Sequence, residues 1–106
     1  MNRAMIEGKR EAMKTKKYCA FIVTFIQKHF PHIDKIPDAK FNEPLTGPLI
    51  AMRANDVLTL YMLLCDLFKV EIILTSIDAF NSVEAISKAL LSYINEEMLD
   101  LYVREN

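Results

Sequence analysis

All four prolines of this chain lie within residues 31–53, together with one of its two glycines. Proline has no backbone N–H and interrupts a helix, and glycine weakens both helices and strands. The residues on either side of this segment therefore run for long distances with few breakers. A fold made of many short strands would need more turn residues than this, so the distribution of proline and glycine favours an all-α domain.

The proline-containing segment itself is predicted to be a long connection between helices. Connections longer than about 15 residues are uncommon unless they pack against the domain or have a function of their own. Apolar residues recur along this connection, at Ile33, Ile36, Phe41, Leu45, Leu49 and Ile50. We therefore expect the loop to pack on the domain.

Three segments have apolar residues at the spacing of an amphipathic helix. They are residues 17–30, residues 55–68 and residues 81–95. The β-branched segment 69–74 has no convincing second strand to pair with, so we expect an extended, buried crossover. Residues 75–80 are expected to hold one short helical turn. The prediction is a small helical bundle with three long helices, one short helix and a long first loop.

The ends of these helices have recognisable signals. Pro31 should end the first helix. Asn55 is predicted to be the N-cap of the second helix, with Asp56 in its first turn where an acid complements the helix dipole. Asn81 and Glu84 have the spacing of a capping box at the start of the last helix.

Both ends of the chain leave an alternative open. Residues 1–16 are polar and basic, and they are predicted to form an N-terminal arm ahead of a helical domain spanning residues 17–106. This arm is either loose or an extension of the first helix. At the other end, Leu99, Leu101 and Val103 either prolong the last helix or dock as a tail.

The net charge of −1 combines two oppositely charged parts. Residues 1–40 carry nine Lys/Arg against four Asp/Glu, whereas residues 41–106 carry four against ten. The basic residues cluster in one short tail without interleaved aromatic residues, so nucleic acid is not expected as a partner. No apolar run approaches the ~18 residues that a membrane span needs.

The cysteines and the N-terminus bear on the cellular compartment. Cys19 and Cys65 lie far apart among apolar neighbours and form no C-x-x-C motif, which is typical of buried thiols in a cytoplasmic protein. No long apolar run follows the positive charges near the N-terminus, so a signal peptide is not predicted.

Residues that could support catalysis or metal binding are few. His29 and His32 lie near Asp34 and Asp38, but Pro31 interrupts the helical geometry that would bring the two histidines to one face, so no metal site is predicted. His29 is expected to end the first helix. Cys65 with either histidine could suggest a nucleophile and base, but no orienting third residue is apparent and Cys65 lies at the edge of the apolar face, which indicates an inert thiol. We assign no catalytic residue and expect no enzymatic activity.

Three motifs between Leu49 and Ile94 resemble the acyl carrier protein family. The segment Leu67-Phe68-Lys69-Val70-Glu71-Ile72 is similar to the family's exit from its second helix. Ile77-Asp78-Ala79-Phe80 is similar to the apolar and acidic short turn that follows, and Asn81-Ser82-Val83-Glu84-Ala85-Ile86 to the start of the family's final helix. The resemblance implies an acyl carrier protein-like bundle.

The same resemblance locates a missing group. Family members have Asp-Ser-Leu at the start of the second helix, and the serine hydroxyl carries a phosphopantetheine arm. Counting back from Phe68 and Ile72 puts Arg53, Ala54 and Asn55 at these positions. Ala54 has no hydroxyl, and no serine lies between Met1 and Thr75. No cofactor-binding residue is therefore assigned, and phosphopantetheine is not expected.

A narrower resemblance concerns the segment that enters the second helix. The sequence E-P-L-T-G-P-L, followed by A-N-D-V-L-T-L, is similar to acyl carrier-related proteins of peptide-maturation systems. This resemblance implies protein partners among biosynthetic or modifying enzymes. Self-association remains open.

The predicted contact surface is the side of the second helix that turns away from its apolar stripe. The candidate docking residues are Asn55, Asp56, Leu58, Thr59, Met62, Leu63 and Asp66. Exposed Met and Leu residues often mark a protein contact. The expected function is a non-catalytic docking component of a peptide- or acyl-modifying pathway. The alternatives are a genuine carrier with an atypical attachment site, such as Thr46, and an unrelated helical interaction module.

Overall fold

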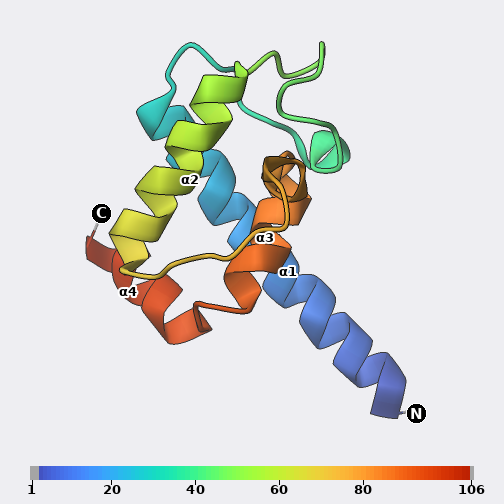
Figure 1. Cartoon of the computed structure of the whole chain (residues 1–106). Coiled ribbons are helices and arrows are strands. Elements are labelled where there is room, and N and C mark those ends of the chain that lie inside the picture. The colour runs from blue at the N-terminus through green and yellow to red at the C-terminus, as the bar shows by residue number, and fades with distance from the viewer. Residues whose placement is uncertain (1–2, 106) are drawn as a thin grey trace.

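The computed structural model describes the backbone of residues 3–105 and the side chains of residues 14–76 and 78–104. Within this range the chain forms only helices, joined by turns and loops (Figure 1). The helices are α1 (Arg3–His29), η1 (Asp38–Lys40), α2 (Ala54–Phe68), η2 (Ile77–Phe80), α3 (Val83–Leu91) and α4 (Glu96–Glu105), where η denotes a 3₁₀ helix. The prediction of an all-α class is confirmed. No described helix has both the length and the hydrophobicity that crossing a membrane requires.

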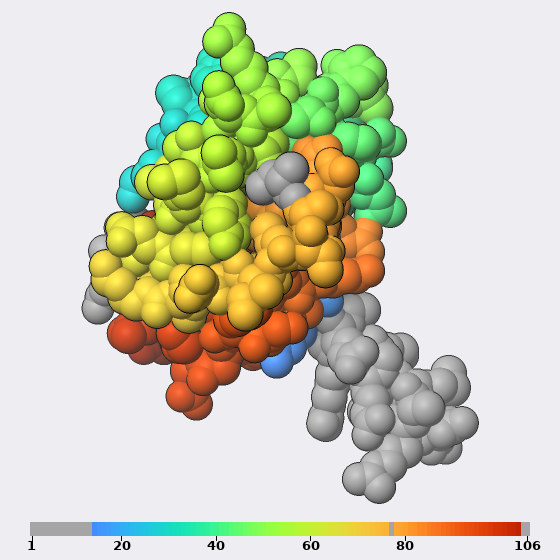
Figure 2. Space-filling view, viewed as in Figure 1, coloured from blue at the N-terminus to red at the C-terminus, as the bar shows by residue number. Residues whose placement is uncertain are grey.

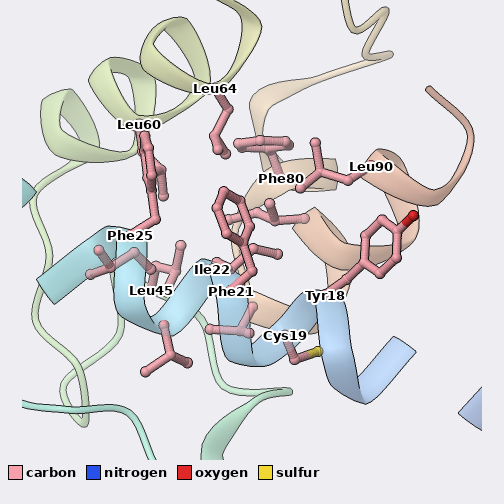
Figure 3. Close-up of a cluster of buried hydrophobic side chains, with 14 of the residues drawn as sticks. Tyr18, Cys19, Phe21, Ile22, Phe25, Leu45, Leu60, Leu64, Phe80 and Leu90 are labelled. Carbon is pink, nitrogen blue, oxygen red and sulfur yellow. The ribbon is translucent and has the colours of Figure 1, made fainter. Parts of the chain in front are cut away.

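The hydrophobic core lies where α1, α2 and α3 meet (Figure 3). Phe21 and Ile22 enter it from α1, Leu60 and Leu64 from α2, and Phe80 from η2. Leu60, Leu64 and Phe80 are completely buried. Burial of side chains of this size contributes roughly 1.5–3 kcal/mol each. The apolar spacing of the first two predicted helices therefore defines the faces that form the core.

Helix α1 is longer than the predicted segment 17–30. It begins at Arg3, so the backbone of the basic arm continues the first helix, which was one of the two alternatives. Figure 1 shows the N-terminal half of α1 projecting from the body of the molecule. Among the described side chains, the Ser87 hydroxyl of α3 donates to the carbonyl oxygen of Thr15 on α1 (3.1 Å). The helix ends at His29, as expected from Pro31.

Helix α2 begins one residue before the predicted segment. Arg53 occupies its N-cap position, so the predicted cap at Asn55 is wrong. The carboxylate of Asp56 accepts a hydrogen bond from the backbone N–H of Arg53 (3.3 Å). The acid at the third helical position thereby pairs the backbone N–H of the N-cap residue. The helix ends at Phe68, followed by Lys69 in the left-handed region (φ 55°).

The predicted last helix, residues 81–95, is wrong in length. It is replaced by the shorter α3 and a separate helix, α4. Ser82 rather than Asn81 caps α3, because its hydroxyl accepts a hydrogen bond from the backbone N–H of Ala85 (3.0 Å). The Asn95 side chain accepts from the backbone N–H of Met98 (2.9 Å) and so starts a new helix. Of the three C-terminal residues expected to prolong the last helix or to dock, Leu99 is buried, whereas Leu101 and Val103 are exposed on α4.

The long loop packs on the domain, as predicted. Ile33, Ile36 and Leu45 are buried, whereas Leu49 is exposed. Backbone hydrogen bonds join the loop to the beginning of α3: the N–H of Leu45 donates to the carbonyl of Asn81 (3.0 Å), and the N–H of Glu84 donates to the carbonyl of Phe41 (3.0 Å). The entry to α2 is thereby fixed against η2 and α3.

The crossover from α2 to η2 has no strand among residues 69–76, as expected. Its burial is uneven: Ile72 is buried, but Ile73 is 80% exposed. The Tyr61 hydroxyl donates to the carbonyl of Ile72 (2.6 Å), and the N–H of Ile73 donates to the Tyr93 hydroxyl (3.0 Å). Two tyrosines therefore hold a segment that has no strand partner.

Candidate interaction surface

The side of α2 that faces solvent carries the predicted docking residues. Asn55, Leu58, Thr59, Met62 and Asp66 are exposed, and we call them the α2 outer face. Leu58 and Met62 are 47% and 61% exposed, although both side chains are large and apolar. Figure 2 shows α2 and the crossover on the face of the molecule toward the viewer. No described segment covers this face, so the two apolar side chains are available for contact.

The two remaining predicted residues lie at the margin of this face. Asp56 and Leu63 are half-buried. Leu63 packs against the edge of the core, and Asp56 holds the start of α2 through its bond to Arg53. The Nε2 atom of His32 lies 3.8 Å from the Asp56 carboxylate. Both residues therefore have structural roles, and the apolar part of the exposed surface reduces to Leu58 and Met62.

The polar members of the α2 outer face make only local contacts. The Thr59 hydroxyl donates to the carbonyl of Asn55 one turn earlier (2.8 Å). The carboxylate of Asp66 lies 3.4 Å from the Lys69 ammonium, and both side chains are more than three-quarters exposed. An exposed ion pair of this kind contributes little to stability. The fold therefore depends little on the side chains of Thr59 and Asp66.

A hollow at the start of α2 contains Ala54, the residue that the resemblance puts at the position of a carrier's serine. Ala54, Thr46 and Asn81 line this hollow, which has a volume of about 280 Å³. The Asn81 side chain donates to the Thr46 hydroxyl (3.0 Å) and accepts from the Thr46 backbone N–H (3.2 Å). The methyl group of Ala54 cannot form a phosphodiester, so Ala54 offers no attachment point for a phosphopantetheine arm.

The histidine and acid cluster near the end of α1 does not form a metal site. Among the described residues, no three His, Cys, Asp or Glu side chains are grouped in a way that would bind a metal ion. The ring of His29 lies 4.4 Å from that of Phe25, and His32 is exposed beside Phe30.

The two cysteines are free thiols. Burial raises the pKa of the Cys19 thiol above its ordinary value, so the thiolate is disfavoured at neutral pH. Cys65 is half-buried on α2. Neither cysteine is placed with a histidine among the described contacts, and so neither resembles an activated nucleophile.

A second surface, which the sequence did not indicate as a site, lies between α1 and α4. This α1/α4 groove has a volume of about 480 Å³, with walls formed by Ala20, Phe21, Phe25, Leu99, Tyr102 and Val103. Lys17 and Lys28 lie along its edge. The available signal was the spacing of Leu99 and Val103, which are four residues apart and share one side of a helix.

Comparison of the chain with protein-family models, with curated proteins and with solved structures found no match. The resemblance to acyl carrier proteins therefore stays a prediction.

Proposed function

We propose that this chain is a non-catalytic docking protein of a peptide- or acyl-modifying pathway, similar to an acyl carrier protein but without the attachment serine. It binds a protein partner through the α2 outer face. The observation that carries the proposal is the exposure of Leu58 and Met62, two large apolar side chains one turn apart on the same side of α2.

The chemistry of the α2 outer face supports a protein partner. An exposed apolar pair flanked by Asn55, Thr59 and Asp66 combines side chains that gain free energy on burial with polar groups that can form hydrogen bonds at the rim. Methionine is adaptable in shape and is frequent at interaction surfaces. The charged residue of this face, Asp66, is acidic, which does not favour an anionic partner such as nucleic acid.

The order of elements supports the resemblance to carriers. A long loop, a helix, a short helical turn and another helix follow one another from residue 31 to Leu91. Ala54 is the first residue of α2, where the family has its serine. A carrier-like protein without an arm retains its surface for partner enzymes but cannot transfer an acyl group, so docking is the activity that remains.

The proposal is tested by site-specific crosslinking. A photoreactive residue at Leu58 should capture one or a few proteins in cells of the source organism, and mass spectrometry identifies them. We expect acyl- or peptide-modifying enzymes, and we expect their capture to fall at least about tenfold when Met62 is replaced by Glu, because an anchor of the interface is removed.

The matched control is Val103→Glu, which places the same charge on an exposed apolar residue of α4. This variant should leave the capture at Leu58 unchanged. Capture that survives Met62→Glu, or capture of proteins with no role in such pathways, would contradict the proposal.

One observation favours a second candidate, a genuine carrier with an unusual attachment site. Thr46 lies in the same hollow as Ala54, and its hydroxyl is the only one there among the described lining residues. Attack of this hydroxyl on the pyrophosphate of coenzyme A would form a phosphodiester and release adenosine 3′,5′-bisphosphate. Intact mass after incubation with coenzyme A and a broad-specificity phosphopantetheinyl transferase decides between the two candidates.

A mass increase equal to one arm, absent in Thr46→Val, would establish the carrier. An unchanged mass, with a true carrier modified in parallel, would support the docking protein. The third alternative, an unrelated helical interaction module, predicts that Met62→Glu changes the oligomeric state rather than the capture of another protein.

A further inference from the structure

The α1/α4 groove has an apolar floor and exposed apolar sides. Phe21, Phe25 and Leu99 line the groove and are buried, so they form its floor. Ala20 and Val103 also line it and are exposed, and Val103 keeps 55% of its surface in contact with solvent. A ligand in the groove would therefore remove apolar surface from water, which is favourable.

The size of the groove suits one small molecule. Its volume of about 480 Å³ lies in the range of roughly 300–1,000 Å³ that is typical of small-molecule pockets. Ten described residues line it, whereas each side of a stable protein–protein interface contributes roughly 20–30. The groove therefore fits a small ligand with an apolar body better than it fits a segment of another protein.

The Lys17 end of the groove is unfavourable for an anion. The Lys17 ammonium lies 2.6 Å from the carboxylate of Asp100 and 3.9 Å from that of Glu96. One cation faces two acids here, so the net charge of the group is negative and it repels a further negative charge. An anionic head group is therefore disfavoured at this end.

The Lys28 end of the groove is favourable for an anion. Lys28 lines the groove eleven residues after Lys17 on α1, about 16 Å along the helix axis. Its ammonium forms no ion pair with an acidic side chain among the described residues. The Thr24 hydroxyl, one turn earlier, already donates to the carbonyl of Ala20 (3.1 Å). Lys28 therefore offers an unpaired charged donor to a ligand carboxylate.

The distance between the two lysines sets the length of the ligand. An extended alkyl chain advances by about 1.3 Å per carbon, because its bonds of about 1.5 Å meet at nearly tetrahedral angles. A chain of roughly ten to twelve carbons therefore spans the groove from Lys28 to the ion pair of Lys17 with Asp100. A longer tail would meet this ion pair, and covering charged groups with hydrocarbon is unfavourable.

We propose that the α1/α4 groove binds a medium-chain fatty acid. The carboxylate of the ligand pairs with Lys28, and its alkyl chain lies on Phe21 and Phe25 with the methyl end toward Lys17. The apolar stem of the Lys28 side chain adds to the wall, while its ammonium meets the carboxylate. No described residue that lines the groove belongs to α2, so the inference is independent of docking through the α2 outer face.

Isothermal titration calorimetry of the full chain with dodecanoate, below its critical micelle concentration, tests this site. We expect saturable binding of one dodecanoate per chain. Hexanoate should bind at least about tenfold more weakly, because it buries less hydrocarbon, and hexadecanoate should bind no more tightly than dodecanoate.

A variant that fills the groove tests its location. Ala20→Phe places a ring between α1 and α4 and should weaken dodecanoate binding at least about tenfold. Ala79→Phe is the matched control, because it adds the same ring to an exposed alanine of η2 outside the groove, and it should leave the binding unchanged. Circular dichroism checks that each variant is folded.

The role of Lys28 is tested with decanoate and 1-decanol, which have the same number of carbons but differ in charge. The parent chain should bind decanoate about fivefold more tightly, as expected for an exposed ion pair, and Lys28→Gln should bind the two ligands equally. Lys16→Gln removes the same charge from an exposed lysine of α1 that does not line the groove, and it should keep the preference.

Absence of saturable dodecanoate binding overturns the proposal, as does a preference for decanoate that Lys28→Gln retains. Evidence of another occupant would overturn it as well. Such evidence would be a protein captured in cells by a photoreactive residue at Val103, or a dimer of the chain that Ala20→Phe dissociates.

Discussion

The hydroxyl of Tyr18 donates a 2.6 Å hydrogen bond to the carbonyl oxygen of Ile94. The two residues are 76 positions apart, and Tyr18 is fully buried. Ile94 lies in the turn between α3 and α4, so its carbonyl is outside both helices. One side chain of α1 therefore fixes the position at which the chain turns into α4.

Tyr18→Phe should destabilise the fold by about 1–2 kcal/mol, because it leaves the buried Ile94 carbonyl without its donor while it preserves the aromatic packing. Urea unfolding followed by circular dichroism measures this change. Tyr93→Phe is a suitable control, since the Tyr93 hydroxyl accepts from an exposed backbone N–H. An equal loss in both variants would contradict the role assigned to Tyr18.

The stability of the chain should fall as the pH rises above about 10. Burial, together with the nearby carboxylates of Glu96 and Asp100, raises the pKa of Tyr18 in the folded state. The hydrogen bond with Asp100 raises the pKa of Lys17. Both groups hold their proton more tightly when folded, so their contribution is complete below the unfolded pKa and is lost as the pH passes the folded pKa. Across this pH range the free energy of unfolding should decline less steeply for Tyr18→Phe than for the parent chain.

Truncation of Leu64 and truncation of Met62, both on α2, should have very different effects on the free energy of unfolding. Leu64 is completely buried and Met62 is 61% exposed. Leu64→Ala should lower the free energy of unfolding by about 2–5 kcal/mol, because it leaves a cavity in the core. Met62→Ala should change it by no more than about 0.5 kcal/mol. Similar losses for the two variants would mean that the α2 outer face is covered.

Asn95→Ala should destabilise the start of α4 by about 1 kcal/mol, because it removes the side chain that accepts from the Met98 N–H. Asn95→Asp retains an acceptor and should retain the stability. Chemical shifts of the α4 backbone locate the effect. Changes confined to α3 would contradict a capping role for Asn95.

The two thiols should differ in reactivity. Cys19 is 2% exposed and its pKa is raised by burial, whereas Cys65 is half-buried. Alkylation of the native chain should therefore modify Cys65 before Cys19, and the two single cysteine variants allow each rate to be measured. Equal rates in the native chain, but not in urea, would contradict the predicted order.

The sequence predicted well those elements whose apolar residues have helical spacing. The faces of α1 and α2 could be identified because Ile22 and Leu64 belong to regular stripes that enter one core. The ends of helices were harder to predict, because a cap depends on which local hydrogen bond wins. Ser82 and Asn81 both suit an N-cap, but the Asn81 side chain bonds to Thr46 instead, accepting from its backbone N–H and donating to its hydroxyl.

The candidate sites, too, could be predicted from the sequence only where they depend on helical spacing. The exposure of Met62 followed from its position opposite the apolar stripe of α2. The pairing of α1 with α4 did not follow, because it depends on the break at Asn95, and no periodic pattern specifies where a helix turns back. The proximity of Thr46 to Ala54 likewise depends on tertiary bonds to Asn81.

The bonds from the long loop to the beginning of α3 have a kinetic consequence. Phe41, Leu45 and Thr46 each bond to residues of 81–84, about 35–45 positions later in the chain. Such contacts can form only after α2 and the crossover have been brought into place, and the closure of a long segment slows folding. The loop should therefore become ordered late, and proteases should find it accessible during folding but resistant once the native chain has formed.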